Sequence, residues 1–380
     1  MRIALIGRDA HRVLAFRGSL VRLAQHEGHE VIAITAPAAG DEIGALAHAG
    51  VRWFGAPLEG GGLNPFADLA YRLALERILR EQRIDAVLAY NPKCLAHGPI
   101  AARRAGVARV VGTVTGLGHG FIGHGWHERL VRLAKARLYR RAFVACDQIL
   151  VQNPQDLAEL ERCGAVDARC RNRVECIPGS GVDLEHFTPR PLSVGAHFLM
   201  IARPLREKGL PEYFQAAQMV TREFPEATFS WMGPMEDANP SALSRPEIEC
   251  MLAAGVVRHI PESADVRPAL AACSVFVLPS HREGTSKVML EAMAMGRGVV
   301  TTDAPGCAHL VHGGIAGLAT RVGDPEALAS TLRTCAGDAA WRARAGDEAR
   351  MRVEREYDAR MVDRLVLQAI TCGTAATFRS

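Results

Sequence analysis

The chain is expected to form two α/β domains, each with a parallel sheet flanked by helices. Three observations predict this fold class. Short apolar runs alternate with amphipathic stretches along the whole sequence. The length of 380 residues is about twice that of a typical domain. Glycine and proline cluster at mid-chain, in residues 178–183 and 188–191, where we place a hinge.

The apolar runs suit buried parallel strands because they are short and rich in β-branched residues. In the first half they are residues 2–6, 30–35, 51–55, 86–89, 109–113 and 148–152. In the second half they are residues 198–202, 228–232, 257–260, 274–278 and 298–302. We therefore expect a first Rossmann-like domain over residues 1–180 and a second over residues 189–357.

Composition excludes several classes of protein. A net charge of +4 is too small to indicate nucleic-acid binding. The ten cysteines have no C-x-x-C spacing, which indicates reduced thiols rather than a metal site. The N-terminal apolar run is too short for a signal peptide, and no window approaches the roughly 20 apolar residues of a membrane span. We expect a cytoplasmic protein whose membrane contact, if any, is peripheral on the cytoplasmic face.

The first strand is not followed by a dinucleotide-binding fingerprint. Gly7 and Gly18 flank a longer segment that contains Arg8, Asp9 and Arg12, and no G-x-G-x-x-G occurs there. Because a dinucleotide needs a tight glycine turn at this place, a dehydrogenase is disfavoured.

Two glutamates lie across a predicted strand-to-helix turn. Residues 275–278 read as a buried strand that ends at Pro279, and a helix is expected from about Ser286. Glu283 then lies in the loop after the strand, and Glu291 lies about one turn inside the helix. Both carboxylates can face a ligand at this helix N-terminus, where parallel sheets bind ligands.

Three segments resemble motifs of the retaining glycosyltransferases of family 4, and they follow one another along the chain in the order found in that family. Glu283 and Glu291 match the E-x7-E signature of that family. Arg203, Lys208 and Gly209 match its R-x4-K-G diphosphate site, and residues 177–183 resemble its interdomain segment. The likeness covers nearly the whole chain.

The resemblance implies the GT-B architecture, with two Rossmann-like domains and an interdomain cleft. The first domain would bind the acceptor, and the second would bind the nucleotide sugar. The last segment, 358–380, would form a helix that packs back on the first domain. Periodicity alone predicts only a helix there.

The resemblance also implies the roles of the site residues. Glu283 would contact the donor sugar or its oxocarbenium-like charge, and Arg203 and Lys208 would neutralise the departing diphosphate. Glu291 would hold the ribose hydroxyls. The donor phosphates would meet the start of the helix, where the candidates are Gly284, Thr285, Ser286 and Lys287. Lys287 departs from the leucine that is commoner in the family.

The first domain offers weaker candidates. We expect Gly18 to open the helix after the first loop, where glycine would let the backbone approach the donor. Many relatives have histidine where this chain has Thr115, so no catalytic base is assigned. His119 and His124 lie nearby in a glycine-rich segment, and His119 is a candidate for the acceptor side. Same-face attack assisted by the leaving phosphate needs no protein base, and we expect neither metal nor cofactor.

A basic amphipathic helix is predicted over residues 127–143. Its expected apolar stripe contains Leu130, Val131, Ala134, Leu138 and Ala142. The expected basic face contains Arg129, Arg132, Lys135 and Arg140. This face is either simply solvated or attracted to anionic lipid or to a lipid diphosphate.

The sequence therefore predicts a metal-independent retaining glycosyltransferase. Residues 113–118 and 278–306 are most similar to the branch that extends polyprenyl-diphosphate-linked glycans, including N-acetylgalactosaminyl transfer. The expected partners are a UDP-sugar donor and a glycan acceptor on a polyprenyl diphosphate. Two alternatives stay open: a UDP-sugar epimerase of the same fold, and a non-catalytic nucleotide-sugar-binding protein.

Overall fold

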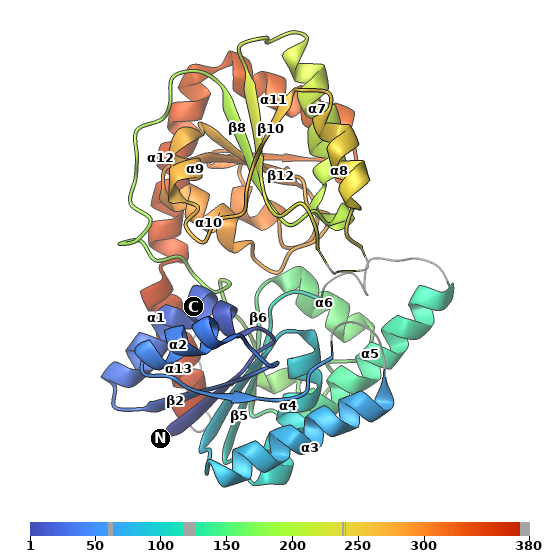
Figure 1. Cartoon of the computed structure of the whole chain (residues 1–380), viewed down its shortest axis with the longest axis vertical. Helices are drawn as coiled ribbons and strands as arrows, with labels where there is room; N and C mark the ends of the chain where they lie inside the picture. Colours follow the sequence, from blue (N-terminus) through green and yellow to red (C-terminus); the bar gives the residue numbers. More distant parts are fainter. Residues whose placement is uncertain (60–63, 118–125, 238, 240, 373–380) are drawn as a thin grey trace. The chain divides into compact units, whose positions relative to one another are not determined.

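A computed structural model describes residues 1–59, 64–117, 126–237, 239 and 241–372. The chain divides into two compact units (Figure 1). The first contains Met1–Ser180 and the helix α13 (Ala359–Thr371), and the second contains Gly181–Asp358.

The first unit is built on a seven-stranded sheet in the order β3-β2-β1-β4-β5-β6-β7, and every pairing in it is parallel. Its strands are β1 (Arg2–Ile6), β2 (Glu30–Thr35), β3 (Arg52–Gly55), β4 (Ala86–Tyr90), β5 (Arg109–Val114), β6 (Gln148–Val151) and β7 (Val174–Cys176). Its helices, besides α13, are α1 (Ala10–His26), α2 (Gly40–His48), α3 (Pro65–Glu81), α4 (Pro92–Ala105), α5 (Trp126–Ala145) and α6 (Pro154–Arg162).

Both faces of this sheet are buried, as expected for parallel strands with helical crossovers. In β1, Ala4 and Ile6 join the core beneath α3 and α4, whereas Ile3 and Leu5 join the core beneath α1 and α13. Because successive side chains of a strand point to opposite faces, one short apolar run supplies both cores.

The helix α13 completes the second of these cores. Its apolar residues, Val362, Val366 and Ile370 among them, pack with residues of α1 and of the sheet. Arg109 Nε of β5 donates a 2.7 Å hydrogen bond to the carbonyl of Ala369 near the end of the helix.

The second unit has a six-stranded parallel sheet in the order β10-β9-β8-β11-β12-β13. Its strands are β8 (His197–Ile201), β9 (Thr228–Met232), β10 (Val257–Ile260), β11 (Val275–Leu278), β12 (Gly298–Thr302) and β13 (Gly317–Thr320). Its helices are α7 (Leu210–Thr221), α8 (Arg245–Leu252), α9 (Arg267–Ala272), α10 (Lys287–Ala294), α11 (Pro325–Gly337) and α12 (Ala339–Glu356).

All expected strands are present within one residue at each end, and the two-sheet fold class is confirmed. The sequence pattern missed β7 and β13. Both are edge strands of three or four residues with a partly exposed pattern, so their apolar signal is weak.

Each sheet reverses its strand order once, between β1 and β4 in the first unit and between β8 and β11 in the second. Helices leave the two central strands toward opposite faces at such a place. The loops after these strands separate there, and ligands of open α/β sheets bind at this edge.

Candidate functional site

The reversal point of the second sheet gathers most of the expected donor residues. Arg203 and Lys208 lie in the loop after β8, where a short 3-10 helix, η3 (Arg206–Lys208), precedes α7. Glu283 lies in the loop after β11, and Glu291 lies one turn inside α10. These segments, far apart in sequence, therefore meet at the carboxyl edge of two neighbouring strands.

Lys208 and Glu283 form the central contact of this site. Lys208 Nζ lies 2.5 Å from Glu283 Oε1, and the side chains are 22% and 12% exposed. Such a half-buried pair is shielded from water, so each charge acts strongly on the other and on any ligand placed beside them.

The two loops that carry this pair are hydrogen-bonded to each other. The carbonyl of Glu207 accepts from the backbone N–H of His281 at 2.8 Å and from Ser280 Oγ at 3.0 Å. His281 Nε2 lies 2.8 Å from Glu212 Oε1 of α7, and this carboxylate raises the pKa of His281. These bonds fix the position of Glu283 relative to Lys208.

Two glycines allow the loops to approach. Gly209 has φ 76°, and a Cβ there would lie 2.1 Å from the carbonyl oxygen of Pro279. Gly306, also at φ 76°, lies in the loop after β12, and a Cβ there would lie 1.9 Å from the carbonyl oxygen of Glu283. The N–H of Glu283 in turn donates to Pro305 O at 3.0 Å. Only glycine fits these contacts.

Glu291 is as little exposed to solvent as Glu283. Its side chain is 12% exposed, and Lys287 Nζ lies 3.8 Å from its Oε1. Burial raises the pKa of Glu291 to about 7, while the charge of Lys287 opposes this shift. The carboxyl group is therefore close to half protonated at neutral pH and can both donate and accept hydrogen bonds.

Replacing Glu291 with glutamine is expected to remove a pH-dependent loss of stability. The folded protein keeps the Glu291 proton up to about pH 7, whereas the unfolded chain loses it near pH 4.5. Folded protein thus binds more protons between these values, and its stability falls as the pH rises. Relative to the variant, the wild type should lose about 3 kcal/mol of unfolding free energy between pH 5 and 8. Denaturant titrations across this range measure the difference, and a constant difference would contradict the assignment.

Other expected donor residues lie at the same edge. Arg203 is 35% exposed, and its Nη1 lies 3.2 Å from Asp237 Oδ2. Gly284, Thr285 and Ser286 precede α10, with Ser286 as its N-cap residue. The sequence analysis did not identify Asp237 or His281, because nothing in their local pattern distinguishes them from ordinary loop residues.

The prediction that Gly18 opens the helix after the first loop is wrong. The helix α1 begins at Ala10, so Gly18 lies buried in the helix interior and does not open it. Asp9 serves as the N-cap residue, and the apolar spacing of Val13 and Leu20 continues the helix through the glycine. His119 and His124 lie outside the described residues.

The predicted basic helix exists as α5, and Leu138 and Ala142 of the expected apolar stripe pack inward, but the buried side is centred on other residues. Its buried side is set by the aromatic rings of Tyr139 and Phe143, stacked at 5.6 Å between centroids, and α5 packs on α4. Ala134, assigned to the apolar stripe, is exposed. Arg132 and Lys135 are instead half-buried.

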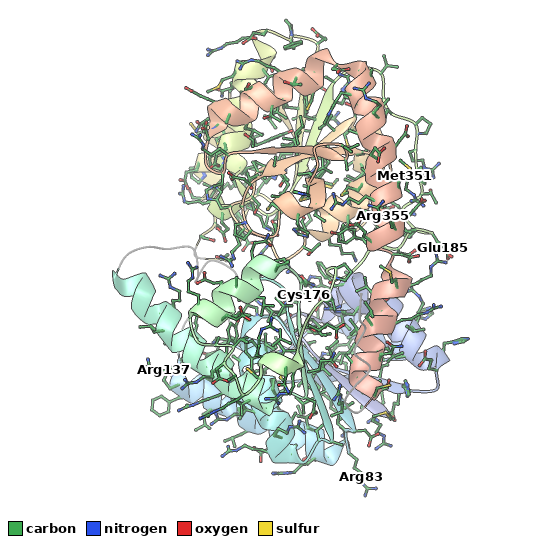
Figure 2. All side chains as sticks on the ribbon, turned by 180° about the vertical axis from the view of Figure 1, so that it is seen from behind. Arg83, Arg137, Cys176, Glu185, Met351 and Arg355 are labelled. Carbon is green, nitrogen blue, oxygen red and sulfur yellow. The ribbon has the colours of Figure 1, made fainter. Side chains whose placement is uncertain are left out.

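Burial changes the charge environment of these two basic residues. Arg132 Nη1 lies 3.9 Å from Glu159 Oε1, and desolvation lowers the pKa of Lys135. Arg140 is exposed as expected, and Figure 2 shows Arg137 projecting from the same helix. The side chain of Arg129 lies outside the described residues.

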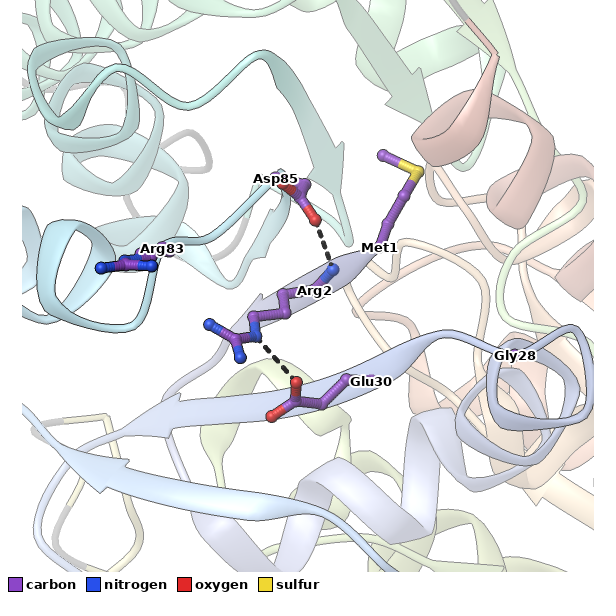
Figure 3. Close-up of a pocket in the computed structure, with 6 residues that line it drawn as sticks. All are labelled: Met1, Arg2, Gly28, Glu30, Arg83 and Asp85. Carbon is purple, nitrogen blue, oxygen red and sulfur yellow. Dashed lines mark hydrogen bonds and ion pairs between the residues drawn. The ribbon is translucent and has the colours of Figure 1, made fainter.

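A separate hollow of about 450 Å³ lies at the amino ends of strands β1, β2 and β4 in the first unit (Figure 3). Its lining residues are Met1, Arg2, Gly28, Glu30, Arg83 and Asp85. The backbone N–H of Arg2 donates to Asp85 at 2.7 Å, and Arg2 Nε donates to Glu30 at 2.8 Å. Because this hollow is at the amino ends of the strands, we do not assign it to the site.

Two general features of the described part of the chain bear on function. It contains no group of three or more histidine, cysteine, aspartate or glutamate side chains placed to hold a metal ion. Among the helices that it includes, none is both long and apolar enough to cross a membrane.

Comparison with solved structures shows the fold. Sucrose-phosphate synthase from Thermosynechococcus elongatus is similar with a TM-score of 0.79 and 18% identity, over 97% of this chain and 98% of that one. The Anabaena HepE protein in complex with UDP-glucose is similar with a TM-score of 0.78 and 17% identity, over 97% of this chain and 98% of that one. The architecture is GT-B.

Two curated bacterial proteins are similar in sequence. The first, from Campylobacter jejuni, is an N,N'-diacetylbacillosaminyl-diphospho-undecaprenol alpha-1,3-N-acetylgalactosaminyltransferase, 26% identical over 87% of this chain and 88% of that protein. The second, from Escherichia coli, is a UDP-Gal:alpha-D-GlcNAc-diphosphoundecaprenol alpha-1,3-galactosyltransferase, 26% identical over 74% of each.

Family models match both units. Residues 195–338 match the glycosyl transferases group 1 model. This range includes all the donor-site residues described above. Residues 15–179 match the glycosyl transferase 4-like domain. The two sheets and the two family models agree: the chain belongs to the GT-B glycosyltransferases. Its first half matches the glycosyl transferase 4-like domain, and its second half matches the glycosyl transferases group 1.

Proposed function

We propose that this glycosyltransferase moves a sugar from a UDP-sugar to a glycan carried on a polyprenyl diphosphate, with retention of configuration and without a metal. The observation that carries the proposal is the Lys208–Glu283 pair at the same sheet edge as Arg203 and the half-buried Glu291. The names of the two curated relatives, which act on diphospho-undecaprenol-linked glycans, support the choice of acceptor. HepE with UDP-glucose supports the choice of donor.

The residues of the site suit each part of this reaction. The bond between the anomeric carbon and the diphosphate oxygen breaks, and the acceptor hydroxyl oxygen bonds to that carbon on the same face. The hydroxyl proton passes to the leaving phosphate oxygen. Arg203 and Lys208 stabilise the charge that grows on the diphosphate, and Glu283 stabilises the positive charge on the sugar. Glu291 accepts hydrogen bonds from the ribose.

Replacing Arg203 with alanine tests the donor assignment. We expect UDP affinity to fall about tenfold to a hundredfold, because a charge-assisted contact to the diphosphate is lost. Uridine affinity should stay nearly constant, since uridine has no phosphate. Calorimetry with both ligands measures this, and Arg245→Ala, an exposed arginine of α8, is the control. Equal losses for UDP and uridine would count against a diphosphate contact.

The same preparation distinguishes the alternative functions. A UDP-sugar incubated without acceptor is converted to its epimer by an epimerase, and no UDP is released. A non-catalytic binding protein leaves it unchanged. Our proposal requires UDP release that depends on a prenyl-diphosphate-linked sugar acceptor.

Peripheral contact with the membrane belongs to this proposal, because the acceptor is anchored there. The support comes from α3 more than from α5. Phe66, Leu69 and Leu73 are 84%, 42% and 52% exposed and lie along one face of α3, and Arg77 continues that face. An exposed apolar stripe followed by a basic residue suits the surface of an anionic bilayer. Co-sedimentation with anionic vesicles tests the contact.

A further inference from the structure

The reversal point of the first sheet lies at β1 and β4, and its loops have not been assigned a ligand. The loop after β1 and the residue after β4 are joined, because the N–H of Arg8 donates to Asn91 Oδ1 at 3.1 Å. Asn91 has φ 68° and ψ 148°, a conformation that costs a non-glycine residue about 1–3 kcal/mol. Backbone strain of this kind is concentrated at functional sites. It marks the start of α4 as a position of interest.

The start of α4 is electrostatically incomplete. Asn91 is its N-cap residue, but its side chain makes no capping bond, and the first turn contains no acidic residue. The first turn instead contains Lys93. A cation at this end opposes the helix dipole, whereas an anion would be stabilised both by the dipole and by the amide groups of that turn.

Four ionisable side chains from two packed helices surround this point. Asp68 and Arg72 lie one turn apart on α3, and Lys93 and His97 lie one turn apart on α4. Lys93 Nζ lies 3.1 Å from Asp68 Oδ1, and His97 Nε2 lies 3.6 Å from Asp68 Oδ2. Asp68 thus contacts one permanent cation and an imidazole, and Arg72 lies close enough to lower the pKa of that imidazole.

Several nitrogen atoms of this cluster have no partner within hydrogen-bond distance among the described residues. His97 is 4% exposed, and neither of its ring nitrogens has a hydrogen-bond partner among the described residues. The same holds for Arg72 Nε. Buried polar atoms are nearly always bonded, so the unbonded Arg72 N–H and the His97 ring, which has one N–H when neutral and two when protonated, indicate a ligand rich in acceptor oxygens.

We propose that Lys93, His97, Arg72 and the start of α4 form the subsite for the diphosphate of the lipid-linked acceptor. This inference rests on the proposed function and deepens it. Phe66, Leu69 and Leu73 lie on another face of the helix that carries Asp68 and Arg72, and they offer the prenyl chain an exposed apolar surface on α3. Asp68 holds Lys93 in place until the phosphate oxygens replace it.

Binding at this subsite should be coupled to proton uptake. Burial lowers the pKa of His97, with Arg72 and Lys93 acting in the same direction and Asp68 against them. The ring of Tyr71 packs edge-on against His97, at 6.2 Å between centroids. A diphosphate adds negative charge beside the ring and raises its pKa, so His97 takes up a proton when the ligand binds.

Calorimetry on the full chain, with UDP present to fill the donor site, tests the proposal. Farnesyl diphosphate is the probe, and inorganic pyrophosphate separates the lipid from the bare phosphate. We expect farnesyl diphosphate to bind more tightly than pyrophosphate. Lys93→Gln should weaken it at least tenfold, and Arg104→Gln, an exposed change at the far end of α4, should leave it unchanged.

A second variant makes the result independent of a folding defect. With wild-type protein, the binding enthalpy should depend on the ionisation enthalpy of the buffer, and His97→Gln should abolish that dependence while binding remains. Wild-type affinity in Lys93→Gln, or farnesyl diphosphate binding that UDP abolishes, would overturn the subsite. Failure of UDP itself to bind would instead refute the proposed function. The farnesyl diphosphate titration would still show whether the subsite at α4 binds a prenyl diphosphate.

Discussion

Replacing Glu283 with glutamine is expected to lower kcat about 100-fold or more. Glutamine keeps the shape of the side chain and can still accept a hydrogen bond from Lys208, so the loop geometry survives. The change removes only the negative charge that we assign to the positive sugar in the transition state. The fall should therefore appear in kcat, with little change in the affinity for UDP.

The control for this experiment is Glu249→Gln, an exposed glutamate of α8 that is ion-paired with Arg245. It removes one negative charge from the same unit without touching the site. Steady-state kinetics with saturating donor measure both variants. Unchanged turnover in Glu283→Gln would remove Glu283 from the catalytic group, and a rise in the donor KM alone would make it a binding residue.

Replacing Gly306 with alanine is expected to cost about 2–5 kcal/mol of unfolding free energy. The added methyl group would lie 1.9 Å from the carbonyl oxygen of Glu283, and the residue would keep a left-handed φ of 76°. Relief of the clash moves the backbone of Glu283, so transfer should fall as well. Denaturant unfolding and turnover measure the two effects.

Gly255→Ala separates strain from collision. Gly255 has φ 69°, and no atom lies within 4 Å of the position of its added Cβ. We expect this variant to lose about 1–2 kcal/mol of unfolding free energy, which is the cost of holding alanine in the left-handed conformation, and to keep normal turnover. Equal losses in both variants would show that the close approach of the loop to Glu283 does not stabilise the site.

Much of this fold could be predicted because its signal is local. A run such as 275–278 is apolar, short and bounded by proline, and it must be a buried strand wherever the chain goes next. The motif residues follow from the strands, since parallel strands place their following loops at one edge. Arg203, Lys208, Glu283 and Glu291 were therefore expected together, and the second sheet places them at one reversal point.

The parts that failed depend on tertiary contacts. The face that α5 buries is decided by the stacked rings of Tyr139 and Phe143, which outweigh the aliphatic stripe. His281 is hydrogen-bonded to Glu212, which lies 69 positions away in the sequence, and no local pattern predicts such a pair. Gly18 was misplaced because a glycine inside a helix looks like a boundary in sequence.

The assignment of α13 to the first unit affects how the protein folds during synthesis. The first sheet and α1 emerge early, but the helix that covers part of them follows only after all of Gly181–Asp358 has been made. At about 5–20 residues per second, the nascent chain exposes that apolar surface for about ten seconds or more. Until α13 arrives, the first unit has a surface that chaperones can recognise, and the last helix closes a core begun by the first strand.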